Sequence, residues 1–172
     1  MTPDADALAR SAGGDARAFD LIVRTHEARV RGFLARVAGA DLADELAQRT
    51  FIQAWRKAGA FRGEAAVGSW LLGIAWTTFL MDRRSDRREA RRREAVGQLA
   101  ERSYAPPQDA AVDAARLLAA LPPDQRAALV LGHGLGHSQS ECAAILGLPL
   151  GTFKSLQARA RARAQTLLGE AG

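Results

Sequence analysis

The spacing of apolar residues constrains the fold of this chain more than any other sequence feature. Between Asp15 and Val37, inward positions recur every three or four residues, which is the repeat of one helical face. They are Phe19, Ile22, Val23, His26, Val30, Phe33, Leu34 and Val37. Alanine, arginine and leucine dominate and favour helix, whereas β-branched residues are sparse and alternating runs are short. The sequence therefore predicts an all-α protein.

The helical pattern dissolves between Val96 and about Asp113, where two consecutive prolines stand among mixed polar residues. A chain of 172 residues has room for one or two small domains. We therefore expect two small helical domains, residues 1–95 and 114–172, joined by a flexible linker over 96–113.

Three helices are predicted in the first domain. Gly39 ends the first, and Asp41 is expected to N-cap the second. The inward stripe of the second is Ala43, Ala47, Thr50, Phe51, Ala54 and Trp55. After a loop over 59–68, a third helix begins near Ser69.

The third predicted helix is apolar on two faces. One side carries Trp70, Leu71, Ile74, Thr78 and Met81, and the opposite side carries Leu72, Trp76 and Phe79. Such a helix must be covered twice. We expect another helix, a partner or unstacked bases to meet the Trp76 face, with structural burial as the favoured reading.

The second domain contains a helix-turn-helix pattern. Ser138 and Glu141 form a capping box that starts a short helix, Gly147 closes it, and a longer basic helix follows. The inward side of that last helix is Phe153, Leu156, Ala160, Ala164 and Leu167. Its outward side, with Lys154, Ser155, Ala158, Arg159 and Ala162, combines cations, a hydroxyl and small residues that admit close approach to a DNA major groove.

Positive charge is concentrated in one segment. The chain has 24 basic and 19 acidic side chains and a net charge of +5, and the stretch from Arg83 to Arg93, with seven arginines against Asp86 and Glu89, carries that same net charge alone. Such a block indicates a polyanionic partner, most commonly nucleic acid. A solvated helix end is the alternative.

The sequence contains no convincing set of catalytic or metal-binding residues. His133 and His137 are four apart, but the glycines between them break helix, so a turn and capping role is preferred to metal binding. Cys142 is alone and reads as a small buried apolar residue. We expect no catalytic residue, cofactor or metal, and a soluble cytoplasmic protein, because no signal segment or membrane span is recognised.

Taken together, the residues resemble those of extracytoplasmic-function (ECF) sigma factors, which are bacterial transcription initiation factors. The resemblance rests on segments 45–55 (ELAQRTFIQAW), 61–64 (FRGE), 69–75 (SWLLGIA), 121–122 (LP), 136–143 (GHSQSECA) and 146–155 (LGLPLGTFKS). It implies sigma domain two in the first unit and sigma domain four in the second.

The resemblance also implies three binding surfaces. The clamp of the largest subunit of core RNA polymerase would be bound by Glu45, Gln48, Arg49 and Gln53. The minus-ten element of promoter DNA would be opened and gripped by Phe61, Arg62, Gly63, Trp76, Thr77, Arg83, Arg84 and Arg87. The minus-thirty-five element would be read as duplex by Thr152, Lys154, Ser155, Ala158 and Arg159. Phe61 is the candidate stacking wall for a flipped base, with a core position as the alternative.

Two residues depart from the family pattern. Relatives usually carry an acid at position 49 and an asparagine at position 77, where this chain has Arg49 and Thr77. We therefore expect a changed polymerase contact and changed minus-ten specificity. The family is commonly controlled by an anti-sigma factor, often membrane-anchored, so such a partner is expected here. The rival interpretations are a free-standing helix-turn-helix regulator and a helical metal-dependent enzyme.

Overall fold

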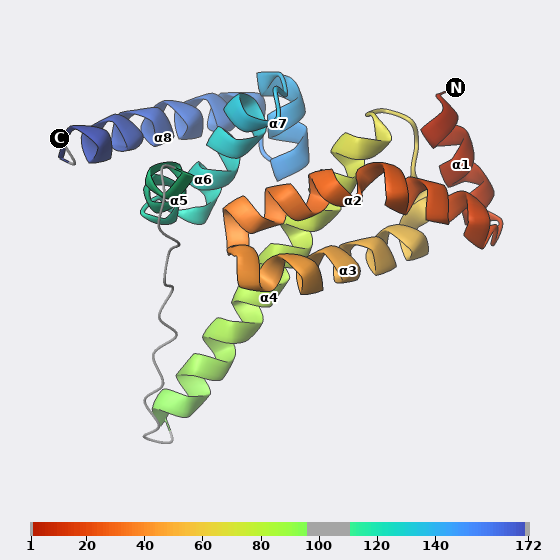
Figure 1. Cartoon of the computed structure of the whole chain (residues 1–172), viewed down its shortest axis with the longest axis horizontal. Coiled ribbons are helices and arrows are strands. Elements are labelled where there is room, and N and C mark those ends of the chain that lie inside the picture. Colours follow the sequence, from red (N-terminus) through yellow and green to blue (C-terminus); the bar gives the residue numbers. More distant parts are fainter. Residues whose placement is uncertain (1, 96–110, 171–172) are drawn as a thin grey trace.

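The computed structural model describes residues 2–95 and 111–170, and every regular element in these ranges is helical (Figure 1). The first unit contains α1 (Pro3–Ala12), α2 (Ala16–Ala38), α3 (Ala40–Lys57), the short 3₁₀ turn η1 (Ala58–Ala60) and α4 (Val67–Ala95). The second contains α5 (Ala111–Ala119), α6 (Pro123–Leu129), the π-helical turn η2 (Val130–Gly134), α7 (Gln139–Leu146) and α8 (Leu150–Glu170). The all-α prediction is confirmed. Most of the predicted linker, residues 96–110, lies outside the described residues.

The first helix, α1, was not predicted by the apolar pattern. The Thr2 side chain accepts a hydrogen bond from the Ala5 amide at 3.3 Å, and Pro3 occupies the first helical turn. Leu8 is fully buried, and Asp4 lies 2.9 Å from the Nε2 atom of His26 on α2. The N-cap and the packing of α1 against other helices thus hold a helix whose apolar stripe is too short to recognise.

The predicted helix from Asp15 to Val37 is confirmed as α2, with the Asp15 carboxylate accepting from the Ala18 amide at 3.0 Å. The predicted N-cap at Asp41 is wrong. Gly39, at φ 102°, both ends α2 and precedes α3, so Asp41 lies within the first turn of α3. A glycine adopts this backbone conformation without strain, and it compresses the connection to one residue.

Two predicted inward positions are partly or largely exposed. Trp55 is 37% exposed, with its ring edge-on to Phe19 at 5.1 Å between centroids. Met81 is 68% exposed, whereas its neighbour Leu80 packs against the core.

Both predicted apolar faces of α4 are buried. Leu71, Leu72 and Ala75 are fully buried, and Trp76 is 5% exposed. α2 and α3 pack on α4 within the first unit, and α7 of the second unit also packs on it. Gly73 lies at this contact, where a Cβ atom would make an ordinary contact with the backbone oxygen of Ile145 at 3.6 Å.

Two polar contacts also join the units. Arg126 on α6 donates from Nη1 to the Val37 carbonyl at the end of α2, at 2.6 Å. The same guanidinium donates from Nη2 to Ala119 and Leu121 within its own unit. Arg29 on α2 lies 3.0 Å from Nε2 of His137. The units therefore share a contact that combines apolar burial with directed hydrogen bonds.

The helix-turn-helix prediction is confirmed in detail. Ser138 and Glu141 form the capping box, and Gly147 ends α7 in the left-handed conformation, at φ 67°. Phe153, Leu156 and Ala160 on α8 are buried as predicted. Gln157 is also buried and accepts a hydrogen bond from Gln139 at 3.0 Å, which ties α8 to the first turn of α7.

Replacing the capping serine is expected to destabilise the second unit. In Ser138→Ala, the Glu141 amide loses its side-chain acceptor and the Glu141 carboxylate loses the hydroxyl donor. The free energy of unfolding should fall by about 1 kcal/mol, the usual cost of losing a serine N-cap. Urea unfolding followed by circular dichroism measures this change.

Ser140→Ala is the matched control, because Ser140 lies in the same turn but does not cap the helix, and it should leave stability within about 0.5 kcal/mol. Hydrogen bonds from Ser138 lower the pKa of Glu141. The Glu141 contribution is therefore full above the ordinary carboxyl pKa and is lost as the pH falls through the lowered folded-state value. Equal destabilisation by both serine variants would contradict the capping assignment.

Candidate nucleic-acid interface

The outward face of α8 presents all five predicted duplex-reading residues to solvent. The exposed residues are Thr152, Lys154, Ser155, Ala158 and Arg159. Phe153, Leu156 and Ala160, on the inward side of α8, are buried in the core. The Ser155 hydroxyl donates to the Gly151 carbonyl at 3.2 Å, so its lone pairs remain as acceptors toward a ligand. This face has donors, an acceptor and a small central side chain on one rigid helix.

The loop before α4 presents a second group of predicted residues. Arg62 and Gly63 are exposed, and Gly63 has φ 74°, which glycine adopts without strain. Phe61 is partly buried, and its ring packs edge-on against Trp70 at 5.4 Å between centroids. The ring thus contacts the core on one edge and remains accessible elsewhere. This arrangement combines the two roles predicted for Phe61, a stacking wall and a core position.

Trp76 and Thr77 are neighbours in sequence but lie in different environments. Trp76 is buried and borders a cavity of about 220 Å³ between α4 and the second unit. That cavity is lined by Trp76, Leu80, Asp124, Leu146, Leu148, Thr152, Leu156 and Arg159. Thr77 is exposed, and its hydroxyl donates to the carbonyls of Gly73 and Ile74. In this arrangement Thr77, and not Trp76, faces solvent.

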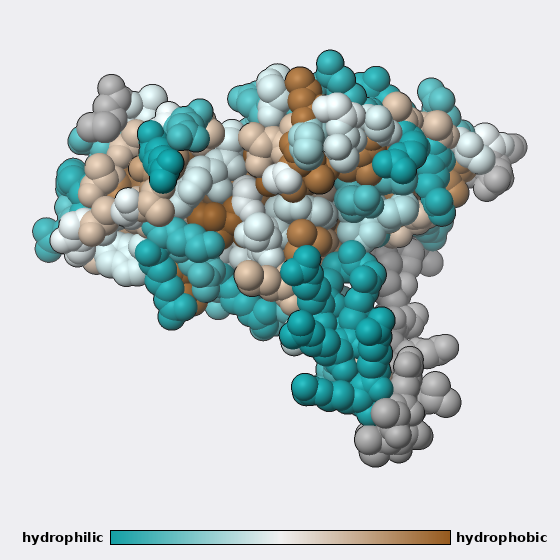
Figure 2. All heavy atoms as spheres, turned by 180° about the vertical axis from the view of Figure 1, so that it is seen from behind, coloured by the Kyte–Doolittle hydropathy of each residue, from teal (hydrophilic) through white to brown (hydrophobic). Residues whose placement is uncertain are grey.

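The second half of α4 is a basic arm, defined here as residues 83–92. It projects from the bundle, and Figure 2 shows it as a continuous hydrophilic surface. Arg84 and Arg87 are exposed, whereas Arg83 is partly buried with its guanidinium 5.6 Å from the centre of the Phe79 ring. Burial, and then the charge of Arg87, lower the pKa of Arg83. Arginine remains charged at neutral pH after such a change, so the arm can follow a phosphate backbone.

The outer face of α3 exposes Glu45, Gln48 and Arg49, with Gln53 partly buried. Arg49 is engaged within the chain: it donates to Glu45 on α3 and, at 2.7 Å, to Asp82 on α4. The hydrogen bond to Asp82, and then that to Glu45, raise the pKa of Arg49. Periodicity could not reveal Asp82, because it lies 33 residues away on another helix.

The residues considered for metal or redox chemistry have other surroundings. Nε2 of His133 accepts from Arg161 at 3.2 Å, and burial lowers the pKa of His137, whose Nε2 faces Arg29. Cys142 is buried, which raises the pKa of its thiol to about 11. Within residues 2–95 and 111–170, no group of three or more histidine, cysteine or acidic side chains could hold a metal ion. No helix in the same ranges is long and apolar enough to cross a bilayer.

These surfaces coincide with known family regions. Residues 22–89 match the family described as Sigma-70 region 2, and residues 112–163 match that described as Sigma-70, region 4. The first match contains α3, the loop and most of the basic arm, and the second contains the helix-turn-helix. The fold and its sites thus define a transcription initiation factor of the sigma-70 class.

Comparison with individual relatives shows to which group within the sigma-70 class the chain belongs. The chain is 38% identical over 169 residues to the ECF RNA polymerase sigma factor SigM of Mycobacterium tuberculosis, covering 96% of this chain and 85% of SigM. It is 33% identical to the RNA polymerase sigma-H factor of Pseudomonas aeruginosa, covering 92% and 90% of the two chains. The chain belongs to the ECF RNA polymerase sigma factors, which are non-enzymatic proteins of transcription initiation.

Solved structures share the fold of both units. The sigma factor RpoE of Bartonella quintana, in complex with the anti-sigma factor NepR, gives a TM-score of 0.75 at 30% identity and covers 90% of this chain and 98% of that one. CnrH, in complex with the cytosolic domain of CnrY, gives 0.71 at 27% identity, with 99% and 100% covered.

A bulky residue at the centre of the α8 outward face should weaken promoter binding. In Ala158→Leu, the larger side chain would hold the helix away from the base edges. We expect affinity for a promoter to fall about tenfold, within the usual cost of losing one base contact. Fluorescence anisotropy of the polymerase complex on labelled promoter DNA measures the change.

Gln165→Leu is the control, because Gln165 is exposed on α8 seven residues after Ala158. That displacement is about two helical turns along the same face, away from the N-terminal end that enters the groove in helix-turn-helix proteins. Similar losses for both variants would argue against α8 as the reading helix.

Proposed function

We propose that this sigma factor binds core RNA polymerase through the outer face of α3 and reads two promoter elements with separate domains. The domains are residues 1–95 and 114–172, with 96–113 as the linker. The supporting observation is the solvent-facing row on α8, from Thr152 to Arg159, within a complete helix-turn-helix. The basic arm on the other domain supplies the second DNA surface.

The two surfaces suit different kinds of DNA contact. Lys154 and Arg159 can donate to guanine edges in the major groove, and Ala158 can lie against a thymine methyl group. Arg84 and Arg87 face solvent along the arm and suit phosphates, which confer affinity and salt dependence rather than sequence preference. The α8 face therefore reads the minus-thirty-five element, and the arm holds the backbone next to the minus-ten element.

Thr77 gives the minus-ten surface its own preference. Its hydroxyl hydrogen is directed to backbone carbonyls of α4, so only lone pairs face an incoming base. An acceptor of this kind favours bases with an exocyclic amino group, which adenine, cytosine and guanine carry and thymine lacks. An asparagine would add an amide donor and broaden the choice. Phe61 and Arg62 complete this surface as stacking wall and phosphate contact.

Promoter binding requires the two domains to separate. The elements lie about 25 base pairs apart, or about 85 Å along B-form DNA. In the closed arrangement, Trp76 from one surface and Thr152 and Arg159 from the other line the same 220 Å³ cavity. One chain cannot reach both elements in that state, so binding to polymerase must open the contact between α4 and the second domain.

Regulation by an anti-sigma factor is part of this proposal, with the factor acting in the cytoplasm. Two structural neighbours were solved in complex with the anti-sigma factor NepR and with the cytosolic domain of CnrY. The closed contact described above offers such a partner a pre-existing arrangement to stabilise. The partner itself can be membrane-anchored while this chain is not inserted.

Transcription from a genomic promoter library tests the proposal. Core RNA polymerase is supplied with and without the protein, and start sites are mapped by sequencing. Discrete new starts that share two spaced motifs are expected. No new starts, together with tight duplex binding by the protein alone, would instead identify a free-standing helix-turn-helix regulator.

The role of Thr77 makes a separate prediction. Thr77→Asn should change base preference at one position of the minus-ten element, because it adds an amide donor. The start-site assay measures this as a changed motif. Thr77→Val, which keeps the shape but removes the lone pairs, should weaken initiation about five- to tenfold without a new preference. An unchanged motif with both variants would remove Thr77 from the reading surface.

A further inference from the structure

Arg49 connects two helices at the edge of the predicted polymerase-binding face. Its Nη1 atom donates to Asp82 on α4 at 2.7 Å, and its Nη2 atom donates to Glu45 on α3. Asp82 is the more enclosed carboxylate, with 17% of its side chain exposed. A single guanidinium thus bridges carboxylates from two helices with donors in a fixed planar geometry.

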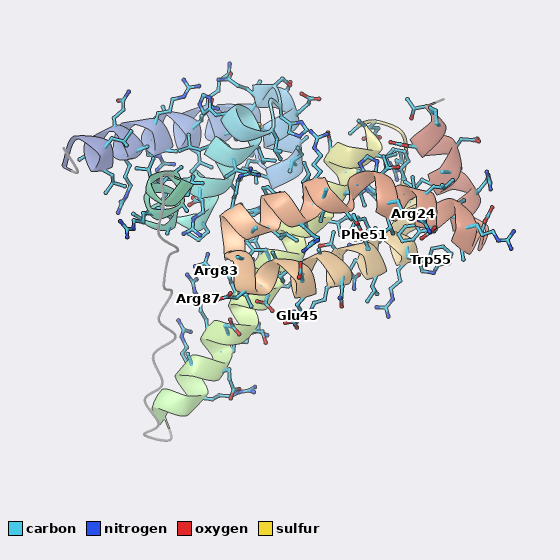
Figure 3. The ribbon with its side chains drawn as sticks, viewed as in Figure 1. Arg24, Glu45, Phe51, Trp55, Arg83 and Arg87 are labelled. Atoms are coloured by element: carbon cyan, nitrogen blue, oxygen red, sulfur yellow. The ribbon has the colours of Figure 1, made fainter. Side chains whose placement is uncertain are left out.

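The ion pair between Arg49 and Asp82 lies where α4 passes from buried to exposed side chains. Leu80, two residues before Asp82, still packs against the core, whereas every side chain from Arg84 to Arg92 is exposed. Figure 3 shows Glu45 beside α4 where it leaves the bundle, with Arg83 and Arg87 on the other side of the helix in this view. Asp82 is therefore at the base of the basic arm.

The arm has little intrinsic stability. Arginines at 83 and 87, 84 and 88, and 88 and 92 are four residues apart, so like charges lie over one another on the helix surface. A solvated helix of this length is marginal in water even without such repulsion. The direction of the arm therefore depends on how firmly its base is attached to the bundle.

Loss of Arg49 would replace an electrostatic attraction between α3 and α4 by a repulsion. Glu45 and Asp82 both approach the same guanidinium, so without it two carboxylates would face each other across the α3–α4 contact. Like charges at this separation repel, and the repulsion would push the base of the arm away from α3.

We propose that Arg49 is a positioning residue that fixes the basic arm relative to the polymerase-binding face. This rests on the proposed function, because the arm is there assigned to promoter DNA. Both terminal nitrogens of Arg49 donate within the chain, so Arg49 is not a free cation on this face. An acid at position 49 would place three carboxylates together in this chain.

The test uses Asp82, which belongs to no predicted binding surface. Asp82→Ala should increase amide hydrogen exchange over residues 82–92 of the free full-length protein about two- to fivefold, the range for losing a partly exposed ion pair. Promoter affinity of the polymerase complex should fall by a similar factor. Affinity for core RNA polymerase should be unchanged, because the α3 face is intact.

Asp20→Ala is the control, since it removes the same charge and an exposed ion pair, with Arg24, from α2 and not from the base of the arm. The double variant Arg49→Asp, Asp82→Arg keeps the summed charge of the cluster and re-forms the pair in reverse. It should restore both exchange and promoter affinity, whereas Arg49→Asp alone should impair both.

The outcomes separate this inference from the proposed function. Equal effects of Asp82→Ala and Asp20→Ala on exchange over residues 82–92, or failure of the double variant to restore either readout, would overturn the positioning role. Faster exchange with promoter affinity equal to that of Asp20→Ala would overturn it too. If the unaltered protein initiates no transcription with core polymerase, the proposed function fails, and the exchange data still decide whether Arg49 holds the arm.

Discussion

The structure depends on the burial of a helix that is apolar on both sides. Leu72, Trp76 and Phe79 cannot face water without losing about 1.5–3 kcal/mol each, and α2 and α3 cover only part of α4. The second unit supplies the rest through α7, which packs on α4 where Gly73 faces Ile145. The contact between domains is therefore a consequence of core formation and not only of the polar contacts made by Arg126 and Arg29.

The first half of α4 is packed in the core, and its second half is the basic arm that we propose binds DNA. Up to Leu80, α4 is held by apolar contacts, whereas the side chains from Arg84 to Arg92 are exposed and include an ion pair within the helix, between Glu89 and Arg92. Asp82 lies between the buried and the exposed part of α4 and pairs with Arg49. Because the transition is abrupt, a modest ion pair at this position has more influence on the arm than the same pair would have on a buried helix.

Local patterns predicted most of the fold, since helix periodicity, the capping box at Ser138 and the stop at Gly147 depend on neighbouring residues. Asp41 was misassigned because Gly39 completes the turn in one residue, which a propensity for capping cannot foresee. Met81 follows the apolar repeat but lies beyond the bundle. The outward face of α8 was predictable from periodicity, whereas the partners of Arg49 and Arg126 were not, because tertiary packing alone brings them together.

The closed contact also sets the free energy that polymerase must supply. A DNA-binding state that is populated only in a fraction of molecules has its apparent dissociation constant raised by the inverse of that fraction. Each additional 1.4 kcal/mol or so in favour of the closed arrangement therefore weakens DNA binding by the free chain about tenfold. In the function proposed above, binding to polymerase offsets this cost by holding the domains apart, which couples promoter recognition to assembly. A partner that contacts both domains would act on the same equilibrium in the opposite direction.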